Sequence, residues 1–211
     1  MQTMNAGVIN PSTGSRRPSG RPSPAKSWLK AIELTSRIEA DPRRLFADLV
    51  EDWAKRQLDR PALISEAETF SYRVLAERIN RYARWALSAG IEAGDTVCLV
   101  MPSRSDYLAA WLGITKVGGV VALINTRLVG LSLAHCVNVA DADHVILAND
   151  LADVFEAALP HLSRAPKIWT HGSHGNQASI NAALDRTDGS PLSPAERRGC
   201  RPRASLLLVV R

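Results

Sequence analysis

The stretch DTVCLVMPSRSDYLAAWLGITKVGGVVALIN, residues 95–125, contains two apolar runs separated by a longer mixed segment. The apolar runs, 95–102 and 120–125, have the length and aliphatic content of buried β-strands. Between them, residues 103–117 begin with polar side chains and continue as an apolar segment of helical length. Two buried strands joined through a helix form a right-handed parallel crossover. This stretch therefore predicts an α/β fold.

The same alternation of strand and helix patterns continues toward the C-terminus. It covers residues 130–141 (helix), 144–149 (strand), 151–162 (helix), 166–172 (strand) and 204–210 (strand). Strands that are apolar throughout are typical of parallel sheets covered on both faces. We therefore predict a doubly wound, mostly parallel sheet with helices on both faces, and a polar connection over residues 173–203.

Before this region, the pattern predicts helices over residues 28–41 and 41–61 and two short strands joined by a polar turn at Glu66–Glu68. A long helix follows, with Ser71 as its N-cap and Gly90 just after its C-terminus. Its expected buried stripe consists of Val74, Leu75, Ile79, Tyr82, Ala83, Ala86 and Leu87.

The charge of the chain is concentrated at its ends. Residues 1–32 carry five Lys/Arg and no Asp or Glu, and residues 197–211 carry five more, again with no acid. The net charge of +5 therefore comes from the ends, and the middle of the chain is mildly acidic. A nucleic-acid-binding protein needs cations gathered on a folded surface, so this distribution argues against nucleic-acid partners.

Composition also predicts how the chain is divided. Residues 1–27 are rich in Pro, Ser and Arg and predict a disordered tail. Residues 28–172 predict the folded α/β region, and residues 173–211 a linker followed by an aberrant or truncated terminal strand. Widely spaced Cys98 and Cys136 in apolar runs, with Cys200, are typical of reduced thiols in a cytoplasmic protein.

The glycine pair Gly118–Gly119 has three possible readings: a phosphate-binding loop, part of a membrane span, or a helix–turn–strand. A phosphate loop follows a strand and opens a helix, whereas this pair follows a helix and precedes a strand. A span over residues 107–125 would place Lys116 and both glycines in its middle. We expect a helix–turn–strand instead, with Lys116 in the last helical turn, and no integral span; peripheral membrane contact stays open.

Histidine residues offer no metal site by their spacing. The five histidines share no ligand spacing with Cys or carboxylates. The closest pair, His171 and His174, is expected in a solvent-exposed loop. Composition and periodicity alone therefore lead to an α/β domain without an assigned chemistry.

Two segments carry a resemblance that goes further. FSYRVLAER (70–78) and ITKVGGVVALINTRL (114–128) resemble two signatures of the adenylate-forming, AMP-binding acyl-CoA synthetases. The likeness runs from about residue 40 to residue 172 and is greatest to the fatty acid transport protein-like, very-long-chain branch. It implies that the chain is part of the large N-terminal domain of such an enzyme.

The resemblance also implies a reaction. In that family a fatty acid or other carboxylate reacts with ATP, with Mg, to an acyl-adenylate, and CoA then displaces AMP. The family's Ser/Thr/Gly-rich ATP loop should follow the strand at 204–210, where this chain reads Arg211 and stops. The resemblance therefore implies an inactive fragment of the ligase that binds none of these cofactors tightly.

The last residues depart from the family pattern before the end. After SPAERR (193–198), a polar and usually acidic approach to the strand is expected, and the chain reads GCRPRASLLLVVR instead. A frameshift near Gly199 is one hypothesis for this departure. Half of a layered domain would also leave a sheet edge unpaired and prone to aggregation.

Candidate site residues follow from the position of the second signature. Asn125, Thr126 and Arg127 lie at the carboxyl end of a predicted parallel strand, where open α/β sheets bind ligands. The resemblance implies that they line the edge of the acyl or CoA cleft, although Arg127 departs from the small polar residue expected there. The alternative is that Asn125 and Thr126 only cap the turn after the strand. No catalytic and no metal-binding residue is predicted.

Two functions from different classes stay open. The first is a fragment of an ATP-dependent carboxylate–CoA ligase, located in the cytoplasm and possibly on a membrane. The second is a non-enzymatic α/β binding or interaction module, such as a regulatory pseudo-ligase.

Overall fold

The computed structural model describes residues 23–40, 45–65, 68–172, 178–198 and 207–210, in two separate units, residues 1–40 and 41–211. In the first unit, helix α1 spans Pro24–Ala40. The Ser23 hydroxyl accepts a hydrogen bond from the backbone N–H of Lys26 (3.4 Å), and Pro24 suits a first helical turn because its missing N–H would be unbonded there. The helix therefore starts within the predicted tail, of which residues 1–22 lie outside the described part.

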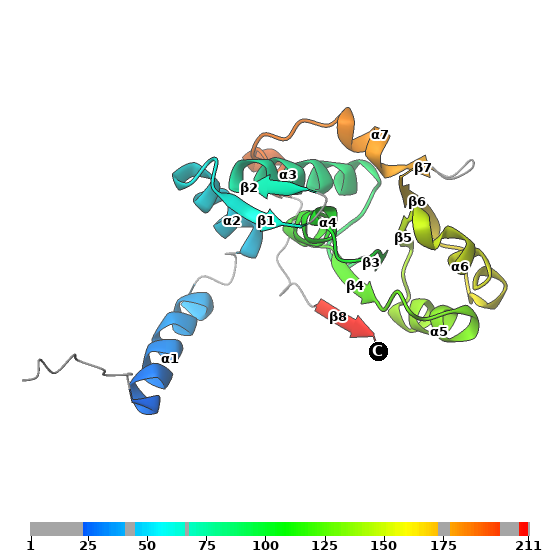
Figure 1. Cartoon of the computed structure of the whole chain (residues 1–211), viewed down its shortest axis with the longest axis horizontal. Coiled ribbons are helices and arrows are strands. Elements are labelled where there is room, and N and C mark those ends of the chain that lie inside the picture. Colours follow the sequence, from blue (N-terminus) through cyan, green and yellow to red (C-terminus); the bar gives the residue numbers. More distant parts are fainter. Residues whose placement is uncertain (1–22, 41–44, 66–67, 173–177, 199–206, 211) are drawn as a thin grey trace, which may run out of the picture. The chain divides into compact units, whose positions relative to one another are not determined.

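The second unit is built on a parallel sheet (Figure 1). The strand order is β7-β6-β5-β3-β4-β8, and every neighbouring pair is parallel. The strands are β3 (Thr96–Val100), β4 (Val120–Ile124), β5 (His144–Ala148), β6 (Lys167–His171), β7 (Ala178–Ser179) and β8 (Leu207–Val210). The predicted parallel α/β sheet is confirmed.

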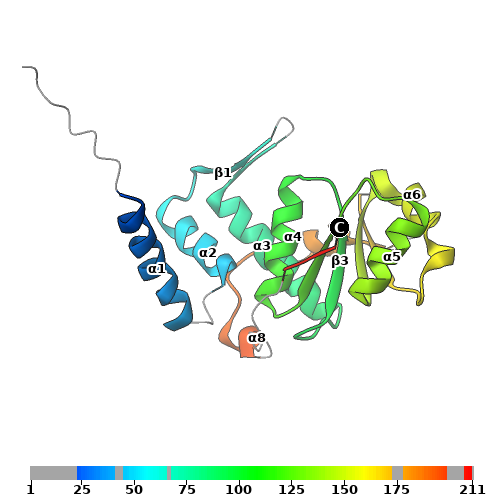
Figure 2. The ribbon, with the colours of Figure 1, turned by 90° about the horizontal axis from the view of Figure 1, so that it is seen from below.

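Helices cover both faces of the sheet, as predicted. On one side lie α3 (Tyr72–Ser88) and α4 (Ser105–Lys116), and on the other α5 (Gly130–Ala140) and α6 (Ala152–Glu156) (Figure 2). Alternate residues of each strand enter opposite cores, because successive side chains of a strand point to opposite faces. Val97 and Leu99 join the α3/α4 core, for example, whereas Cys98 and Val100 join the α5/α6 core.

Helix α3 forms close to where the pattern placed it. The Ser71 hydroxyl accepts a hydrogen bond from the N–H of Val74 (3.3 Å) and caps the helix, and Gly90 has a φ of 82° just after its end. Leu75, Ile79, Tyr82, Ala83 and Ala86 are buried as predicted. The expectation for Val74 is wrong: its side chain is 41% exposed because it lies more than about 100° around the helix from the centre of the buried stripe, while Trp85 is buried instead.

The remaining N-terminal elements pack around α3. Helix α2 (Phe46–Arg56) buries Ala47, Val50 and Ala54 in the same core as α3. Strands β1 (Pro61–Ile64) and β2 (Thr69–Ser71) form the predicted antiparallel pair, which leads directly into α3. Residues 66–67 of the predicted turn lie outside the described residues.

Two predicted connections differ from the structure. The single helix expected over residues 151–162 is three short pieces, η1 (Asn149–Leu151), α6 and η2 (Leu159–His161). Pro160 lacks the N–H that a continuous helix would need, so the turns stay separate. The expected polar connection at 173–203 contains β7, α7 (Ile180–Asp185) and α8 (Pro194–Arg198), and α7 buries Ile180 and Leu184 in the α3/α4 core.

The junction from α4 to β4 is the helix–turn–strand that the glycine pair predicted. Gly118 adopts a φ of 92°, a backbone conformation that favours glycine. Gly113, in the middle of α4, lets α3 approach closely, because a Cβ there would lie 2.5 Å from the Cβ of Tyr82. Among the described helices, none has the length and hydropathy required to cross a membrane.

Candidate functional site

Polar side chains gather where the parallel strands end, at the carboxyl edge of the sheet. Residues 101–104 follow β3, Asn149 and Asp150 follow β5, and His171 is the last residue of β6. Strands β3 and β5 are neighbours, but their following connections cover opposite faces of the sheet. A crevice at such a point is where doubly wound sheets bind ligands. This edge is therefore the first place to look for a site.

A cluster of largely buried, charged side chains lies next to this edge, between α3, α4 and the end of β6. The Arg78 guanidinium on α3 donates to both carboxylate oxygens of Asp106 on α4, from Nε at 2.6 Å and from Nη2 at 3.1 Å. His171 Nε2 lies 3.0 Å from Asp106 Oδ2. The three side chains are between 10% and 18% exposed. The cluster joins α3, α4 and β6, three elements that are distant in the sequence.

Asp106 is held in its ionised form. Burial alone would raise the pKa of its carboxyl, but the hydrogen bonds from His171 and Arg78 and their charges outweigh burial and hold the pKa well below its usual range. Because both oxygens already accept hydrogen bonds, Asp106 is suited to fixing the edge rather than to removing a proton from a substrate. The expectation that His171 lies in a solvent-exposed loop is wrong, since it ends a strand and contacts Asp106; His174 lies outside the described residues.

The three predicted site residues follow β4 at the same edge. Asn125 and Arg127 are exposed, and Thr126 is half-buried. The Asn125 side-chain oxygen accepts a hydrogen bond from the N–H of Arg127 (3.0 Å), and its carbonyl accepts one from Leu128 (3.2 Å). Asn125 thus caps the turn, which is one of the two predicted roles. Among the described residues, none of the three bonds to the Asp106 cluster, and their place in a substrate cleft stays a prediction.

The amino end of α4 at this edge already has an anionic partner. The backbone N–H of Ser105 donates to the Glu68 carboxylate at 3.3 Å, in the position where a helix N-terminus attracts negative charge. Arg104, just before it, pairs with Asp150, which follows β5, at 3.2 Å. Both groups of this pair are partly exposed, so the pair contributes about 0–1 kcal/mol. The β3–α4 turn therefore offers charged side chains but contains no glycine.

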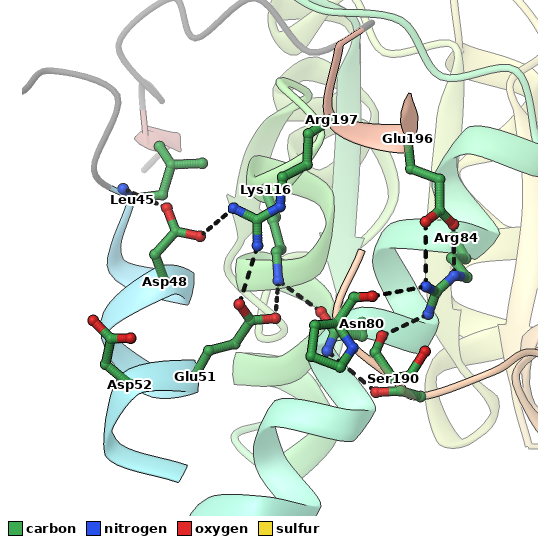
Figure 3. A network of polar contacts seen from close by, with 12 residues as sticks. Leu45, Asp48, Glu51, Asp52, Asn80, Arg84, Lys116, Ser190, Glu196 and Arg197 are labelled. Carbon is green, nitrogen blue, oxygen red and sulfur yellow. Dashed lines mark hydrogen bonds and ion pairs between the residues drawn. The ribbon is translucent and has the colours of Figure 1, made fainter. Parts of the chain in front are cut away.

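A second buried cluster connects α2, α3 and α4 (Figure 3). The Lys116 ammonium, with a side chain only 1% exposed, pairs with Glu51 and donates to Asn80 Oδ1 at 2.6 Å. Arg197 reaches the other oxygen of Glu51 at 3.0 Å. Burial would raise the pKa of Glu51, but the bond and charge of Lys116, with Asn80 and Arg197, outweigh burial and lower it. The prediction that Lys116 lies in the last turn of its helix is confirmed. Its buried partner, Glu51, was not predicted.

Arg84 of α3 makes several hydrogen bonds to the segment after α7 (Figure 3). Its Nη1 donates to the carbonyls of Asp188 and Ser190, each at 2.7 Å, and its Nε donates to Glu196 at 2.6 Å. Asn80 Nδ2 donates to the carbonyl of Gly189 at 3.2 Å. Between this segment, α2 and α3 lies an open cavity of about 480 Å³. Residues 188–197 therefore form a strap, a name used below for this segment.

The described residues offer little for metal or thiol chemistry. Among them, no group of three or more His, Cys, Asp or Glu side chains lies close enough to hold a metal ion. Asp106 and Glu51, the two buried carboxylates, already have cationic partners, so neither fits a Mg²⁺ ligand set. Cys98 and Cys136 are buried free thiols, and burial raises the pKa of Cys98 to about 12. Cys200 lies outside the described residues.

Comparison with known proteins places this fold in a family. Residues 50–202 match the family described as AMP-binding enzyme. The chain belongs to the AMP-binding enzyme family. The matched range includes α3, the β3–α4–β4 crossover, the Asp106 cluster and the whole strap.

Two relatives from different kingdoms have names related to fatty acids. The chain is 31% identical over 174 residues to long-chain fatty acid transport protein 6 of Homo sapiens, covering 80% of this chain and 28% of the relative. It is 28% identical over 148 residues to the long-chain-fatty-acid–CoA ligase of Salmonella typhimurium, covering 69% of this chain and 26% of that protein. The chain thus spans less than a third of the length of these relatives.

Solved structures of CoA ligases share the fold. A benzoate CoA ligase from Burkholderia xenovorans LB400 aligns with a TM-score of 0.64 and 21% identity, covering 72% of this chain and 30% of that one. The anthranilate CoA ligase AuaEII, solved with anthranoyl-AMP, also gives 0.64, with 18% identity over 69% of this chain and 28% of that one. At this identity the likeness establishes the fold alone.

Proposed function

We propose that this chain is part of an ATP-dependent fatty acid–CoA ligase that works through an acyl-adenylate. The observation that carries the proposal is the AMP-binding match over residues 50–202, together with relatives named for long-chain fatty acids. In this reaction a carboxylate oxygen attacks the α-phosphorus of ATP and pyrophosphate leaves. The CoA thiolate then attacks the acyl carbon and AMP leaves.

The residues of this chain would hold the shape of the ligase rather than carry out its chemistry. Asp106 at the start of α4 bonds to Arg78 in the middle of α3 and to His171 at the end of β6, so that the carboxyl edge of the sheet keeps its form. Asn125, Thr126 and Arg127 would line the acyl or CoA side of that edge. ATP and CoA are the family's substrates, whereas the described residues do not fit a Mg²⁺ site, and no step is assigned to the metal here.

The free chain is proposed to be inactive. Its β3–α4 turn has no glycine-rich phosphate cradle, and the acids and bases beside it are paired with one another. Stabilising charge on a phosphoryl group needs donors that are free to face it. The purified 211-residue chain should therefore show no ATP–pyrophosphate exchange with a long-chain fatty acid.

The exchange assay is best run with oleate and benzoate side by side, with a known fatty acid–CoA ligase as the positive control. Robust exchange by the chain would overturn the proposed inactivity. If it does occur, a preference for benzoate over oleate would contradict the fatty-acid assignment. The alternative, a regulatory interaction module, also predicts no exchange, provided that the chain unfolds cooperatively as a monomer. The exchange assay alone therefore does not separate the two candidates.

Adding the chain to a full-length fatty acid–CoA ligase separates these two candidates. A regulatory module should change the partner's rate in a saturable way, whereas a part of a ligase should leave the partner's rate unchanged. A cytoplasmic location and peripheral contact with a membrane are also proposed.

A further inference from the structure

The cavity beside the strap has the size of a small-molecule site. It lies within the second unit, between α2, α3 and the strap, and its volume is about 480 Å³. Ligand pockets commonly measure about 300–1,000 Å³ and have mostly apolar walls with few polar groups. Ala54 of α2, Ala76 of α3 and Gly189 of the strap line the cavity and are buried. Because these residues have small side chains or none, the space between the two helices and the strap stays open.

One polar group in the wall of this cavity has no partner. Arg81 of α3 lines the cavity and is half-buried, and its Nε is buried without a hydrogen-bond partner in the described part of the chain. The strap passes close to this atom, because a Cβ built on Gly189 would lie 3.3 Å from it. Buried polar groups in folded proteins nearly always have a partner, since an unpaired donor costs free energy. The Arg81 donor therefore lacks an acceptor that a ligand could supply.

The acids that line the cavity do not provide this acceptor. Glu51 already has two cationic partners. Asp188 accepts two hydrogen bonds from Ser190, one of them from the backbone N–H at 3.0 Å. Glu77 lies one turn before Arg81 on α3, and its side chain is exposed to solvent. The cavity therefore combines acids that are occupied or exposed with one buried donor that is not used.

Two further cations that line the cavity add no excess of positive charge. Lys55 pairs with Asp52, and Arg73 pairs with Asp59. The four side chains are between 43% and 77% exposed, and ion pairs this exposed contribute little to stability. Recognition of an anion here therefore depends on the direction of the Arg81 donor and not on net charge.

We propose that this cavity binds a small carboxylate whose body is apolar. The carboxylate accepts hydrogen bonds from the Arg81 guanidinium, whose planar fork matches the two oxygens of such a group. Because Arg81 is only half-buried, a small rotation of its side chain turns Nε away from the strap and toward the cavity. The apolar body lies against Ala54, Ala76 and Leu58, of which Leu58 is 48% exposed.

A carboxylate fits the cavity better than a phosphate does. A phosphate monoester carries about 1.5 to 2 negative charges and needs several converging donors, whereas the described lining offers one unused donor beside an apolar wall. The residues that line the cavity do not include Asn125, Thr126 or Arg127, and binding needs neither ATP nor CoA. The inference is therefore independent of the proposed ligation, and failure of one leaves the other standing.

The experiment titrates the full, isotope-labelled chain with octanoate and follows the Nε–H signals of its arginines by nuclear magnetic resonance. The signal of Arg81 is identified by its absence from the Arg81→Gln variant. We expect octanoate to shift this signal in a saturable way. Octanamide has the same body without the charge, and acetate has the charge without the body. Each should bind at least about tenfold more weakly than octanoate.

Variants separate the parts of the site, and binding to them is followed by the backbone N–H signal of Gly189. Arg81→Gln should weaken octanoate binding by at least about tenfold. Arg81→Lys keeps the charge but loses the planar fork, so it should recover only part of the affinity. Leu58→Ser should weaken binding by about fivefold, because apolar contact area is lost.

The matched control is Arg56→Gln. Arg56 is an exposed arginine of α2 that does not line the cavity, so this variant changes the net charge as Arg81→Gln does. It should bind octanoate like the unchanged chain. Thermal unfolding of each variant checks that the second unit stays folded.

Three results would overturn the proposal. The first is the absence of a saturable shift of the Arg81 signal, since water alone would then satisfy its donor. The second is octanamide binding as tightly as octanoate. The third is an equal loss of affinity in Arg56→Gln and Arg81→Gln, which would indicate attraction by overall charge. If Arg81→Gln does not fold, the comparison of octanoate with octanamide and the exposed variant Leu58→Ser still decide the point.

Discussion

The two faces of the sheet are built in different ways. The face covered by α3, α4 and α7 contains two buried ionic clusters, around Asp106 and around Lys116. The core on the α5/α6 face consists of aliphatic and aromatic side chains and two thiols, whereas the buried Glu51, Asp106 and Lys116 belong to the two clusters of the first face. The first face joins segments far apart in the sequence, and the second packs consecutive crossovers. Buried ionic contacts are therefore found on the face where segments distant in the sequence pack together.

The largest effect should come from breaking the Lys116 cluster. Lys116→Met leaves the buried Glu51 without its closest cation, and removing one partner of a buried ion pair costs about 3–5 kcal/mol. Urea unfolding of the second unit would measure the loss. Lys116→Met combined with Glu51→Leu should recover most of it, because both charges are then removed. A single variant as stable as the original would show that the pair contributes little.

A smaller loss is expected from Asp106→Asn, about 2 kcal/mol, because charge-assisted hydrogen bonds to Arg78 and His171 are lost. The folded chain lowers the pKa of Asp106. The stabilisation that the ionised Asp106 gives the folded chain is therefore fully present above pH 4, about the pKa of an aspartate in the unfolded chain. It is lost as the pH falls toward the lower pKa of the folded chain. As the pH is lowered, the free energy of unfolding should fall more steeply for the original chain than for the Asp106→Asn variant. Equal slopes would contradict this role.

Leu133→Met tests the α5/α6 face of the sheet, where Leu133 is buried in the core. An exchange between apolar residues of similar volume costs less than about 1.5 kcal/mol, because the neighbours can repack. This loss should not depend on pH, in contrast to that of Asp106→Asn. Stability measured at two pH values decides the point, and a strong pH dependence would mean that the two faces are coupled.

The smallest effect is expected from Val139→Ser on the outer side of α5, where Val139 is 56% exposed. Surface substitutions of this kind change stability by less than about 0.5 kcal/mol. The variant provides a baseline for the other three in the same unfolding assay. A loss above 1 kcal/mol would indicate that this side of α5 is covered in solution.

Local pattern was enough to predict most of the fold. The β3–α4–β4 crossover, the cap at Ser71 and the turn at Gly118 depend on neighbours within a few residues, so their signals are present in the sequence. The short helix α7 was missed because its six residues bury only Ile180 and Leu184, too few for a periodic pattern.

The candidate site was harder to predict than the fold. Asn125 was placed correctly at the end of β4, and its turn-capping bond is a local feature. No local pattern indicates Asp106 or Arg78, and His171 stands out only as one of a close histidine pair. Their contacts span 28 and 65 residues of sequence and form only when α3, α4 and β6 are in place. Lys116 gave one clue, a lysine within an apolar run, but its partner Glu51 is 65 residues away.

The strap has a consequence for the order in which the chain is made and folded. Arg197 and Glu51 are 146 residues apart, and Glu196 and Arg84 are 112 apart. During synthesis from the N-terminus, α2, α3 and α4 emerge long before the strap that completes their clusters. Contacts between distant segments form late because a long loop must close first. A nascent chain that stalls before residue 188 would therefore hold Arg84 without its carbonyl and carboxylate partners, and chaperones would meet it in that state.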